Sequence, residues 1–530
     1  MRAFDLIAVK IWELKEDLND AAKAVSSDSD DEKLLADLAH WAAGRCGENA
    51  EDVLQQVKVW ANDKSVLPAL RDILEVGAEC NNPPPSWKFT DFLGFSSAEE
   101  RDEWYNNRVL VTMHRGTKQI GGSITQITMG NTSVLTDFGS ALPGSHGTID
   151  DNDIVEKIFR KNKFKVDAVF FTHYHGDHAG LIDKIPKDIP IYMDPAMLKI
   201  LQVLSKYTGN FSMQELLANR DGRIQTFTPG KLFSVGDMNI IPFFVDHSAY
   251  HANMFLFEGA GHTVLHSGDF RNTGYMSKSL EIIPKLIHER YNKQVDVLLT
   301  EGTMMTRSPK VENLLTEWDV NKEAANFMRE HKQIFVVCSS TNFDSLTSIC
   351  RAARTNNLPI YAGDYIMEML KMFSDTAKEK NGLYDLPPVK SIREYFESKA
   401  GEYIILSGSL LGREKGKAEE LYHNYGKGKK DYRPYLIYSM WQGYLDSGHP
   451  AYDEGLAAFV RQFDGRVKYI HSSGHADKET LAKFITNIAP RKYIVPFHTE
   501  NPEGFKNLDI ADKYKDMVIL PQDGDTIKIA

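Results

Sequence analysis

Three histidines and one aspartate occupy six consecutive positions of this chain, directly after the apolar run Val166–Phe171. The segment reads Thr172-His173-Tyr174-His175-Gly176-Asp177-His178-Ala179-Gly180. Imidazole suits Zn, Fe or Mn, and a carboxylate among histidines suits hard and borderline divalent metals alike. An extended turn would project His173 and His175 to one side and let Asp177 and His178 point to another. The segment therefore predicts a metal site that can hold two ions.

Further histidines and aspartates follow other expected strands. A lone histidine after a strand is more often a satisfied core residue than a ligand. Several strand ends that each carry such a residue can instead converge on one point, which favours a shared site with the first segment. These segments are Asp246-His247-Ser248 after 240–245, Ser267-Gly268-Asp269-Phe270 after 263–266, and Pro496-Phe497-His498-Thr499-Glu500 after 493–495.

Together these motifs make the chain recognisable. The segment THYHGDHAG, preceded by Asp137 in LTDFG and followed by His247, Asp269 and His498, resembles the metallo-β-lactamase superfamily. The segments 299–303 (LTEGT) and 472–476 (SSGHA) narrow the resemblance to the β-CASP group of nucleases, and within it to ribonuclease J. The resemblance covers roughly residues 109–530. The first motif alone specifies only the superfamily, whereas the SGHA and PxH elements are more specific.

The resemblance implies a ligand set for two divalent ions. Ligating histidines usually need a second group to orient them, and Asp137 would serve in that role. In this assignment His173, His175 and His247 hold the first metal, Asp177, His178 and His498 hold the second, and Asp269 bridges the two. Zn²⁺ is the first expectation for both ions, with Mn²⁺ as the alternative.

The resemblance also implies residues that handle the substrate. Glu301 matches an acidic residue beside the metals, and His475 matches a histidine that contacts the scissile phosphate and can protonate the leaving oxygen. Gly474 would let the backbone approach a ligand, and the Ser473 hydroxyl would bind phosphate. We thus expect Asp177, Glu301 and His475 to be catalytic and 473–475 to bind substrate. A purely structural hydrogen-bonding role stays open for Asp137, Glu301 and His475.

Phosphodiester hydrolysis explains why these residue types are needed. The substrate is anionic and resists attack by hydroxide. Two cations about 4 Å apart can clamp its oxygens and lower the pKa of a shared water toward neutrality. The leaving 3′-oxygen then needs charge stabilisation or a proton, which the second metal or His475 could supply. No serine nucleophile or P-loop is required, and we find neither GxxxxGK[ST] nor a convincing GxSxG in the sequence.

Composition indicates an intracellular enzyme. The chain has 530 residues, enough for three or four domains, with 42% hydrophobic and 25% charged residues. Its four cysteines form no CxxC pair, so neither a zinc ribbon nor a disulfide framework is predicted. Charged residues interrupt the N-terminal apolar stretch, and no apolar run approaches the roughly 18 residues of a membrane span. We therefore expect a cytoplasmic protein without a membrane partner.

The charge is unevenly distributed. Nucleic-acid enzymes often show a basic footprint, yet the net charge here is −11. Residues 1–80 contain 17 acidic against 9 basic side chains, a net of −8, which leaves −3 for the other 450 residues. That remainder can still present a basic groove near bound dications. The basic runs 413–417 and 427–430 are either substrate contacts or solvated loops.

Hydrophobic periodicity predicts the α/β class, with a small all-α N-terminal module and an inserted α/β unit. The resemblance implies that the rest is a metallo-β-lactamase αββα sandwich and that the inserted unit is a β-CASP cap domain. The expected boundaries are 1–80 for the helical module, 81–108 for a linker, 109–303 and 466–530 for the two parts of the lactamase-type domain, and 304–465 for the cap. A hairpin is expected at 123–136 around Gly130-Asn131. Within the cap, strands are expected at 334–338, 359–362 and 403–406, and helices at 343–354 and 365–373.

The function expected from this pattern is a two-metal ribonuclease, exo- or endonucleolytic, in RNA processing or decay. Its partner would be single-stranded RNA, and a homodimer is one option for its assembly. A DNA nuclease of the same group is the first alternative, although a histidine at the position of His498 is typical of RNA-directed members. Small-molecule metallo-hydrolases share the HxHxDH set but lack a large cap and the SGHA element. A non-catalytic binding subunit would be expected to have lost ligands.

Three departures from ribonuclease J limit the comparison. The chain ends soon after the last lactamase-type strand, so the usual C-terminal domain is not expected. Glu301 lies in TEGT where an Asp-Ser-Thr pattern is more common, and Thr499 replaces a frequent glycine. Exonuclease versus endonuclease action, dependence on a 5′-monophosphate and the oligomeric state are therefore left open.

Overall fold

The structure is a computed structural model of the whole chain that describes residues 31–46, 49–60, 107–142, 149–161, 165–307, 314–377, 384–398, 401–408 and 433–529. It divides into two compact units, residues 1–108 with 156–164, and residues 109–155 with 165–530. Helix α8 (Asp151–Glu156) crosses the division, and the π turn η3 (Lys157–Lys161) belongs to the first unit. Each unit is described by itself.

The described part of the first unit is helical. Helix α4 (Asp31–Cys46) and helix α5 (Ala50–Trp60) pack against each other. Leu38, Ala42 and Val53 are fully buried. This agrees with the helical module expected for residues 1–80. The remaining helices expected in that region and the linker lie outside the described residues.

Two sheets form the body of the second unit. The first has seven strands, antiparallel from β19 to β3 and parallel from β3 to β6. In sheet order they are β19 (Thr526–Lys528), β1 (Val109–Arg115), β2 (Ile124–Met129), β3 (Thr132–Thr136), β4 (Ala168–Phe170), β5 (Ile191–Met193) and β6 (Ile224–Thr226). The hairpin expected at 123–136 is β2–β3.

The second sheet has six strands, parallel from β18 to β10 and antiparallel from β10 to β7. In sheet order they are β18 (Tyr493–Phe497), β11 (Val297–Glu301), β10 (His262–His266), β9 (Asn253–Gly259), β8 (Met238–Phe244) and β7 (Phe233–Val235). Strands far apart in the sequence, such as β11 and β18, are thus direct neighbours.

The two sheets pack face to face around an apolar core. Phe170 of β4 is fully buried and meets Phe255 and Phe257 of β9 edge-on, at ring-centroid distances of 5.6 and 5.8 Å. On β9 the alternate residues, Met254 and Leu256, belong to a second core on the other face of the sheet. Successive side chains of a strand point to opposite faces, so β9 is buried on both.

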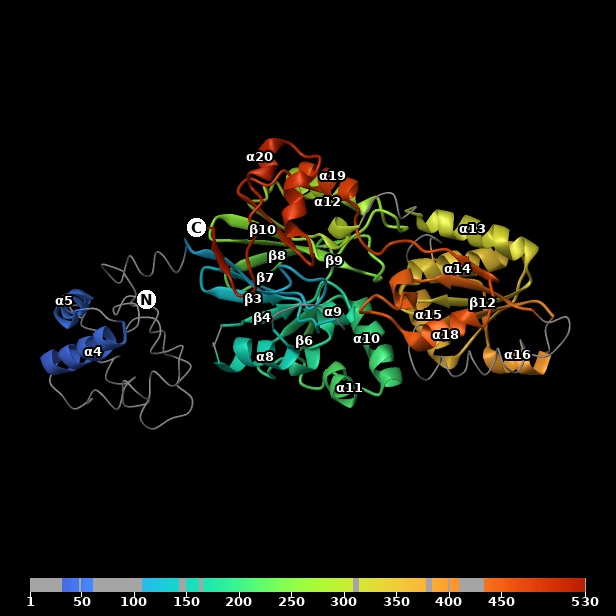
Figure 1. Cartoon of the computed structure of the whole chain (residues 1–530), viewed down its shortest axis with the longest axis horizontal. Coiled ribbons are helices and arrows are strands. Elements are labelled where there is room, and N and C mark those ends of the chain that lie inside the picture. Colours follow the sequence, from blue (N-terminus) through green and yellow to red (C-terminus); the bar gives the residue numbers. More distant parts are fainter. Residues whose placement is uncertain are drawn as a thin grey trace. The chain divides into compact units, whose positions relative to one another are not determined.

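Helices cover the outer face of each sheet, which gives the expected αββα order (Figure 1). On the six-stranded side lie α12 (Ser279–Lys285), η5 (Leu286–Arg290), α19 (Lys478–Ile488), η8 (Pro502–Asn507) and α20 (Asp512–Lys515). On the seven-stranded side lie α9 (Gly176–Ala179), η4 (Ile182–Lys184), α10 (Pro195–Thr208) and α11 (Phe211–Leu217). The metallo-β-lactamase sandwich predicted from the sequence is confirmed.

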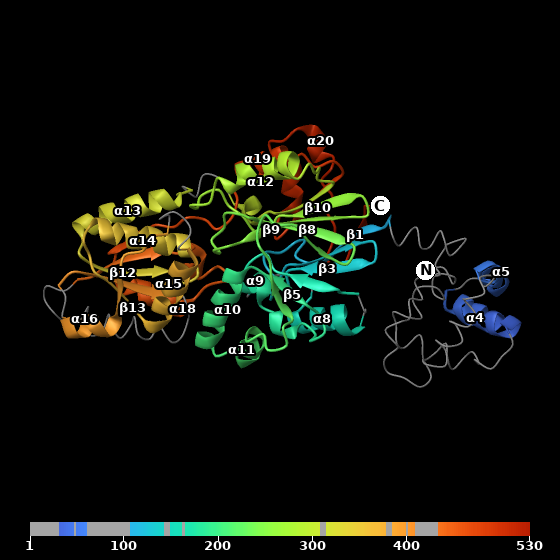
Figure 2. The same ribbon diagram turned by 180° about the vertical axis from the view of Figure 1, so that it is seen from behind.

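A third sheet, entirely parallel, lies between the two parts of the sandwich in sequence (Figure 2). Its order is β14 (Val389–Ser391), β13 (Ile360–Ala362), β15 (Tyr403–Gly408), β12 (Gln333–Cys338), β16 (Tyr435–Ser439) and β17 (Val467–Tyr469). Its helices are α13 (Glu317–Glu330), α14 (Phe343–Thr355), α15 (Asp364–Ala377), α16 (Ile392–Ser398), η7 (Gln442–Leu445) and α18 (Glu454–Arg461). We call this the third-sheet domain.

One expected boundary needs correction. The return to the sandwich was expected at residue 466, yet β17 pairs with β16 and so belongs to the third sheet. Leu436, Ile437 and Tyr438 of β16 are aligned with 467–469 of β17. The short strand carries no pattern that assigns it to either sheet, and only the pairing decides.

Direct contacts join the third-sheet domain to the sandwich beside the histidine-rich segment. The Tyr174 hydroxyl donates to the carbonyl of Thr341 at 2.6 Å, and Ala249 forms a β-bridge with Asn342. The buried Arg271 side chain donates to Asp344 at 2.8 Å. Among the helices of the described ranges, none combines the length and apolar character needed to cross a bilayer.

The central aromatic core can be tested by substitution. We expect Phe170→Ala to destabilise the protein by about 3–5 kcal/mol, because a fully buried ring between two sheets leaves a cavity that neighbouring strands cannot close. The control is Phe211→Ala, since that ring is 80% exposed. Thermal unfolding followed by circular dichroism would compare the two. Equal unfolding temperatures for the Phe170→Ala and Phe211→Ala variants would contradict the assigned core.

Candidate metal centre

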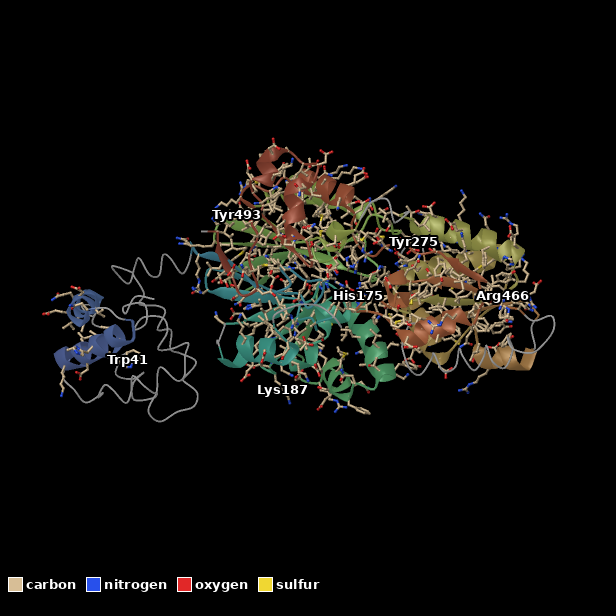
Figure 3. The ribbon with its side chains drawn as sticks, in the orientation of Figure 1. Trp41, His175, Lys187, Tyr275, Arg466 and Tyr493 are labelled. Atoms are coloured by element: carbon tan, nitrogen blue, oxygen red, sulfur yellow. The ribbon has the colours of Figure 1, made fainter. Side chains whose placement is uncertain are left out.

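The histidine-rich segment adopts two backbone conformations in succession. Residues up to His175, whose φ and ψ are −61° and 148°, are extended, and α9 then begins at Gly176. The backbone N–H groups of His178 and Ala179 donate to the carbonyl of His175 and close a single helical turn. The change of conformation brings the ring of His178 back beside that of His173, with ring centroids 4.1 Å apart. Figure 3 shows His175 near the third-sheet domain.

The first group of side chains contains three histidines. One ring nitrogen each from His173, His175 and His247 lies within 4.8 Å of the other two. The outer nitrogens are held, since His173 Nδ1 lies 3.0 Å from the Thr172 hydroxyl and His247 Nδ1 lies 2.6 Å from the carbonyl oxygen of Gly474. These contacts direct the Nε2 atoms of both rings inward.

The second group contains Asp177, His178 and His498, also within 4.8 Å of one another. His498 Nε2 lies 3.1 Å from Asp177 Oδ2, while its Nδ1 lies 2.8 Å from the hydroxyl of Thr303. Thr303 follows β11, so three separate segments meet at this point. His498 takes a positive φ of 51°, an uncommon conformation for a non-glycine residue that the surrounding contacts hold.

Asp269 lies between the two groups. Its Oδ2 is 3.1 Å from His178 Nε2 and 3.7 Å from His498 Nε2, and it also falls within 4.8 Å of His173. It is 1% exposed. This is the position that a bridging carboxylate requires.

Several polar atoms at the centre of these groups have no hydrogen-bond partner although they are buried. They are His173 Nε2, His178 Nε2 and both carboxylate oxygens of Asp269, although His178 Nε2 and Asp269 Oδ2 form an ion pair at 3.1 Å. Buried polar atoms without partners cost free energy, and a buried carboxylate costs most. Imidazole nitrogens and carboxylate oxygens are the donors that Zn²⁺ and Mn²⁺ accept. The residues present therefore fit two divalent cations.

The first group is electrostatically suited to bind a cation. Burial lowers the pKa of His173, His175 and His247, and the neighbouring imidazoles lower that of His173 further. For His175 the pKa falls to about 4. All three rings are thus neutral at pH 7, the state in which a ring nitrogen can donate its lone pair to a metal.

The second group is anionic. Burial alone would raise the pKa of both carboxyls, but contacts with His498 hold that of Asp177 low and His178 holds that of Asp269 low. Burial would lower the pKa of His178, yet Asp269 and Asp137 raise it well above its ordinary value. Without cations, the His178 imidazole is therefore protonated between the carboxylates of Asp269 and Asp137. A divalent ion would replace that proton.

Asp137 orients the histidines from behind. Its Oδ2 lies 2.8 Å from His178 Nδ1, and its Oδ1 accepts the Thr172 backbone N–H at 2.8 Å. It is fully buried and has a φ of 62°. A non-glycine residue in this region is strained, and such strain is characteristic of functional sites. Asp137 thus contacts the outer nitrogen of His178, and the orienting role expected for it stays a prediction.

Glu301 and His475 form a pair beside Asp269. His475 Nδ1 lies 3.2 Å from Glu301 Oε2 and 3.7 Å from Asp269 Oδ2. The Glu301 carboxylate also accepts the backbone N–H groups of Phe270, Thr303 and Ala476. It is completely buried, so it anchors three loops and one imidazole rather than facing solvent. Burial would lower the pKa of His475, but Glu301 raises it above the ordinary value.

Ser473 and Gly474 lie in the site, but their contacts differ from those expected. The Ser473 hydroxyl accepts the N–H of His475 at 3.2 Å and is 9% exposed, so it braces the turn. A Cβ on Gly474 would lie 2.7 Å from the hydroxyl of Ser248. The glycine therefore allows close approach to another loop, and its carbonyl holds His247. The sequence motif could not distinguish these roles from phosphate binding.

Two threonines were not singled out from the sequence. Thr172 contacts both Asp137 and His173, and Thr303 contacts His498. Both lie inside the motifs, THYHGDH and TEGT, but a hydroxyl carries no signal of its own until the fold supplies a partner. The basic runs 413–417 and 427–430 lie outside the described residues.

Comparison with known families agrees with this geometry. Residues 152–334 match a β-lactamase superfamily domain, and residues 462–508 match a Zn-dependent metallo-hydrolase RNA specificity domain. The two matches include all the histidines described above. They support a metal-dependent hydrolase of the metallo-β-lactamase and β-CASP-like type that acts on nucleic acid.

A solved structure shares the fold. The crystal structure of a protein of unknown function from Enterococcus faecalis V583 aligns with a TM-score of 0.60 and 20% sequence identity. The alignment covers 80% of this chain and 100% of that protein. At this level of identity the similarity establishes the architecture alone.

The paired ligand groups predict the metal content. We expect about two divalent ions per chain, because seven convergent ligands are too many for one tetrahedral ion. Elemental analysis of protein purified without chelator would measure this content. His247→Ala should reduce the content toward one. A single equivalent in fully active protein would contradict the two-metal site.

The second ligand group predicts the effect of Asp177→Ala. Its side chain is 15% exposed at the edge of the site, so the fold should persist, whereas hydrolysis should be lost because no other carboxylate lies on that segment. Metal content and hydrolysis would be measured together. The control is Asp188→Ala, an exposed aspartate nearby in sequence. Full turnover with unchanged metal content would show that Asp177 is not a ligand.

Proposed function

We propose that this protein is a two-metal ribonuclease that hydrolyses phosphodiester bonds of single-stranded RNA. One observation carries the proposal: the segment that matches an RNA specificity domain, 462–508, supplies both His475 and His498 to the same cluster as the HxHxDH motif. An enzyme that hydrolyses small molecules would need the metal ligands, but it would not need a segment similar to an RNA specificity domain. The proposal also assigns the third-sheet domain to substrate binding, as a β-CASP cap.

Divalent ions held by the two ligand groups would supply Lewis-acid activation of water and neutralisation of the phosphate charge. His173, His175 and His247 would hold the first ion, and Asp177, His178 and His498 the second, with Asp269 shared. With a metal bound, Asp137 would keep His178 in the tautomer whose Nε2 faces the site, because Nδ1 contacts the Asp137 carboxylate. Thr303 would do the same for His498.

His475 is suited to donate the proton that the leaving 3′-oxygen requires. Its Nδ1 is engaged by Glu301, so a protonated ring presents Nε2–H on its other side. The side chain is 22% exposed and can therefore reach a substrate. Glu301 acts on His475 as an anion that favours the protonated ring, which makes it a positioning residue. The same arrangement serves a phosphate clamp, since a protonated imidazole also binds an anion.

The function can be tested directly with labelled nucleic acid. We expect the purified protein, supplied with Zn²⁺ or Mn²⁺, to cut single-stranded RNA and to act less on DNA of matched sequence. Comparing 5′-labelled with 3′-labelled RNA would show from the product ladder whether cleavage is exonucleolytic, from which end, or internal. Preferential cleavage of DNA would favour the DNA nuclease. Hydrolysis of thioesters or lactones without nuclease activity would refute the proposal.

His475 can be separated from the metal ligands by substitution. His475→Ala should lower the rate by roughly two to four orders of magnitude, as expected for loss of a general acid, while both metals stay bound. Metal analysis and single-turnover kinetics would measure the two effects. A small loss of rate with reduced thermal stability would indicate a structural histidine. Depletion of a metal would place His475 among the ligands.

The role of Glu301 predicts a change in pH dependence. If protonated His475 is the acid, the rate falls as pH rises through its pKa. Because the Glu301 carboxylate raises that pKa, Glu301→Gln should move the descending limb of the pH–rate profile to lower pH. An unchanged descending limb with normal metal content would show that Glu301 does not act on His475.

A further inference from the structure

One cationic side chain beside the metal centre has no part in the ligand groups. Arg307 follows the short turn η6 (Thr303–Thr306), which begins with the threonine that contacts His498. Its guanidinium lies over the ring of Trp441, 5.2 Å from the ring centroid. Trp441 belongs to the third-sheet domain, two residues after the end of β16. The Arg307–Trp441 pair therefore connects the loop after β11 with that domain.

The Trp441 ring is held in a fixed position. The rings of Tyr444 and His449 meet it edge-on, at centroid distances of 5.4 and 4.7 Å, and the Tyr438 hydroxyl donates to the Trp441 carbonyl at 3.1 Å. A Cβ on Gly443 would lie 2.3 Å from ring atoms of Trp441, so only glycine lets the ring rest on this backbone. A fixed indole is the best aromatic partner for a cation.

The positive charge of Arg307 affects the pKa of three residues around the site, including the proposed catalytic His475. It opposes the rise in the pKa of His475, and it adds to the lowering of the pKa of His471, which burial brings to about 4. Burial also raises the pKa of Tyr444, with the carboxylate of Asp177 adding to the rise and Arg307 opposing it. Arg307 thus lies among residues from both the metal centre and the third-sheet domain.

We propose that Arg307, held by Trp441, binds a phosphate of the RNA strand adjacent to the phosphodiester that is cut. This inference rests on the proposed ribonuclease function. A guanidinium that rests on a ring by its face presents its N–H groups around its edge, where they can bind a phosphate in bidentate fashion. Arg307 is partly exposed, so a substrate can reach it.

The surroundings give a physical reason for such a residue. Asp177, Asp269 and Glu301 concentrate negative charge in the site, and the whole chain carries a net charge of −11. Bound metals offset this charge only at the scissile phosphate. The neighbouring phosphates of a polyanionic strand need a separate cation, and a preoriented arginine supplies it with little loss of side-chain entropy.

Binding of RNA as a function of salt tests the inference without relying on turnover. Arg307→Ala, Arg307→Lys and Trp441→Leu would be made in the Asp177→Ala background, which is expected not to cut the probe. The matched control is Arg290→Ala, because Arg290 also lies over a ring, that of Tyr291, at 5.7 Å. The probe is a fluorescein-labelled single-stranded RNA, followed by anisotropy at several salt concentrations.

We expect Arg307→Ala to weaken binding about tenfold, as for loss of a charged hydrogen bond, and to reduce the slope of log Kd against log salt by about 0.7, the value for one phosphate contact to a single strand. Arg307→Lys should keep the slope but bind more weakly than the parent. Trp441→Leu should fall between the parent and Arg307→Ala. In otherwise wild-type protein, KM should rise more than kcat falls, with the metal content unchanged.

The outcomes separate this inference from the function on which it rests. If Arg307→Ala binds with the affinity and salt slope of Arg290→Ala while wild-type protein cuts RNA, the inference fails and the ribonuclease function stands. If wild-type protein cuts no RNA and the parent binds none, the proposed function fails first. Should Arg307→Ala unfold, as judged by circular dichroism, Arg307→Lys and Trp441→Leu decide. Unchanged affinity in both would overturn the role of Arg307.

Discussion

The face-to-face packing of two sheets positions every proposed ligand. Phe170 of β4 packs against Phe255 and Phe257 of β9 between the sheets, and β4 leads directly into the histidine-rich segment. Each ligand lies a few residues beyond a strand that contributes to this core, so the burial of apolar surface holds the strand ends in one place. The ligands therefore converge before any cation binds. Their convergence, in turn, brings together imidazoles and carboxylates whose buried polar atoms lack hydrogen-bond partners.

Hydrogen bonds then control the direction of these side chains, and burial and neighbouring charges control their protonation. Asp137, Thr172 and Thr303 engage the outer ring nitrogens or the backbone beside them, which leaves the inner nitrogens directed at one another. Burial keeps the first histidine group neutral, whereas Asp269 and Asp177 keep the second group anionic. The difference in charge between the groups comes from the carboxylates, which also raise the pKa of His178.

A buried ionic cluster links this site to the third-sheet domain. Arg271 is fully buried and contacts Asp246, Glu317 and Asp344, the last two from helices α13 and α14. It also donates to the carbonyl of Ser473, at the start of the turn that carries His475. Burial raises the pKa of Asp246 to about 7, with Arg271 opposing the rise and Asp344 adding to it. Breaking such a cluster would leave buried charges uncompensated, so it ties the orientation of the domain to the geometry of the turn.

From the sequence by itself, strand periodicity and the dense HxHxDH segment predicted the inserted α/β domain and a metal site, because both are local signals. The αββα sandwich and the full set of proposed ligands came from the resemblance that these motifs carry. It could not assign β17 to the third sheet, since a three-residue strand has no pattern and only its pairing with β16 decides. It also could not show that Gly474 allows the close approach of Ser248, or that Thr303 supports His498, because these roles depend on partners more than 100 residues away in the chain. Arg307 and Trp441 belong to no recognisable sequence motif, so the sequence could not predict their contact. Their contact exists because the tertiary structure places the loop after β11 against the segment after β16, and long-range packing alone brings those residues together.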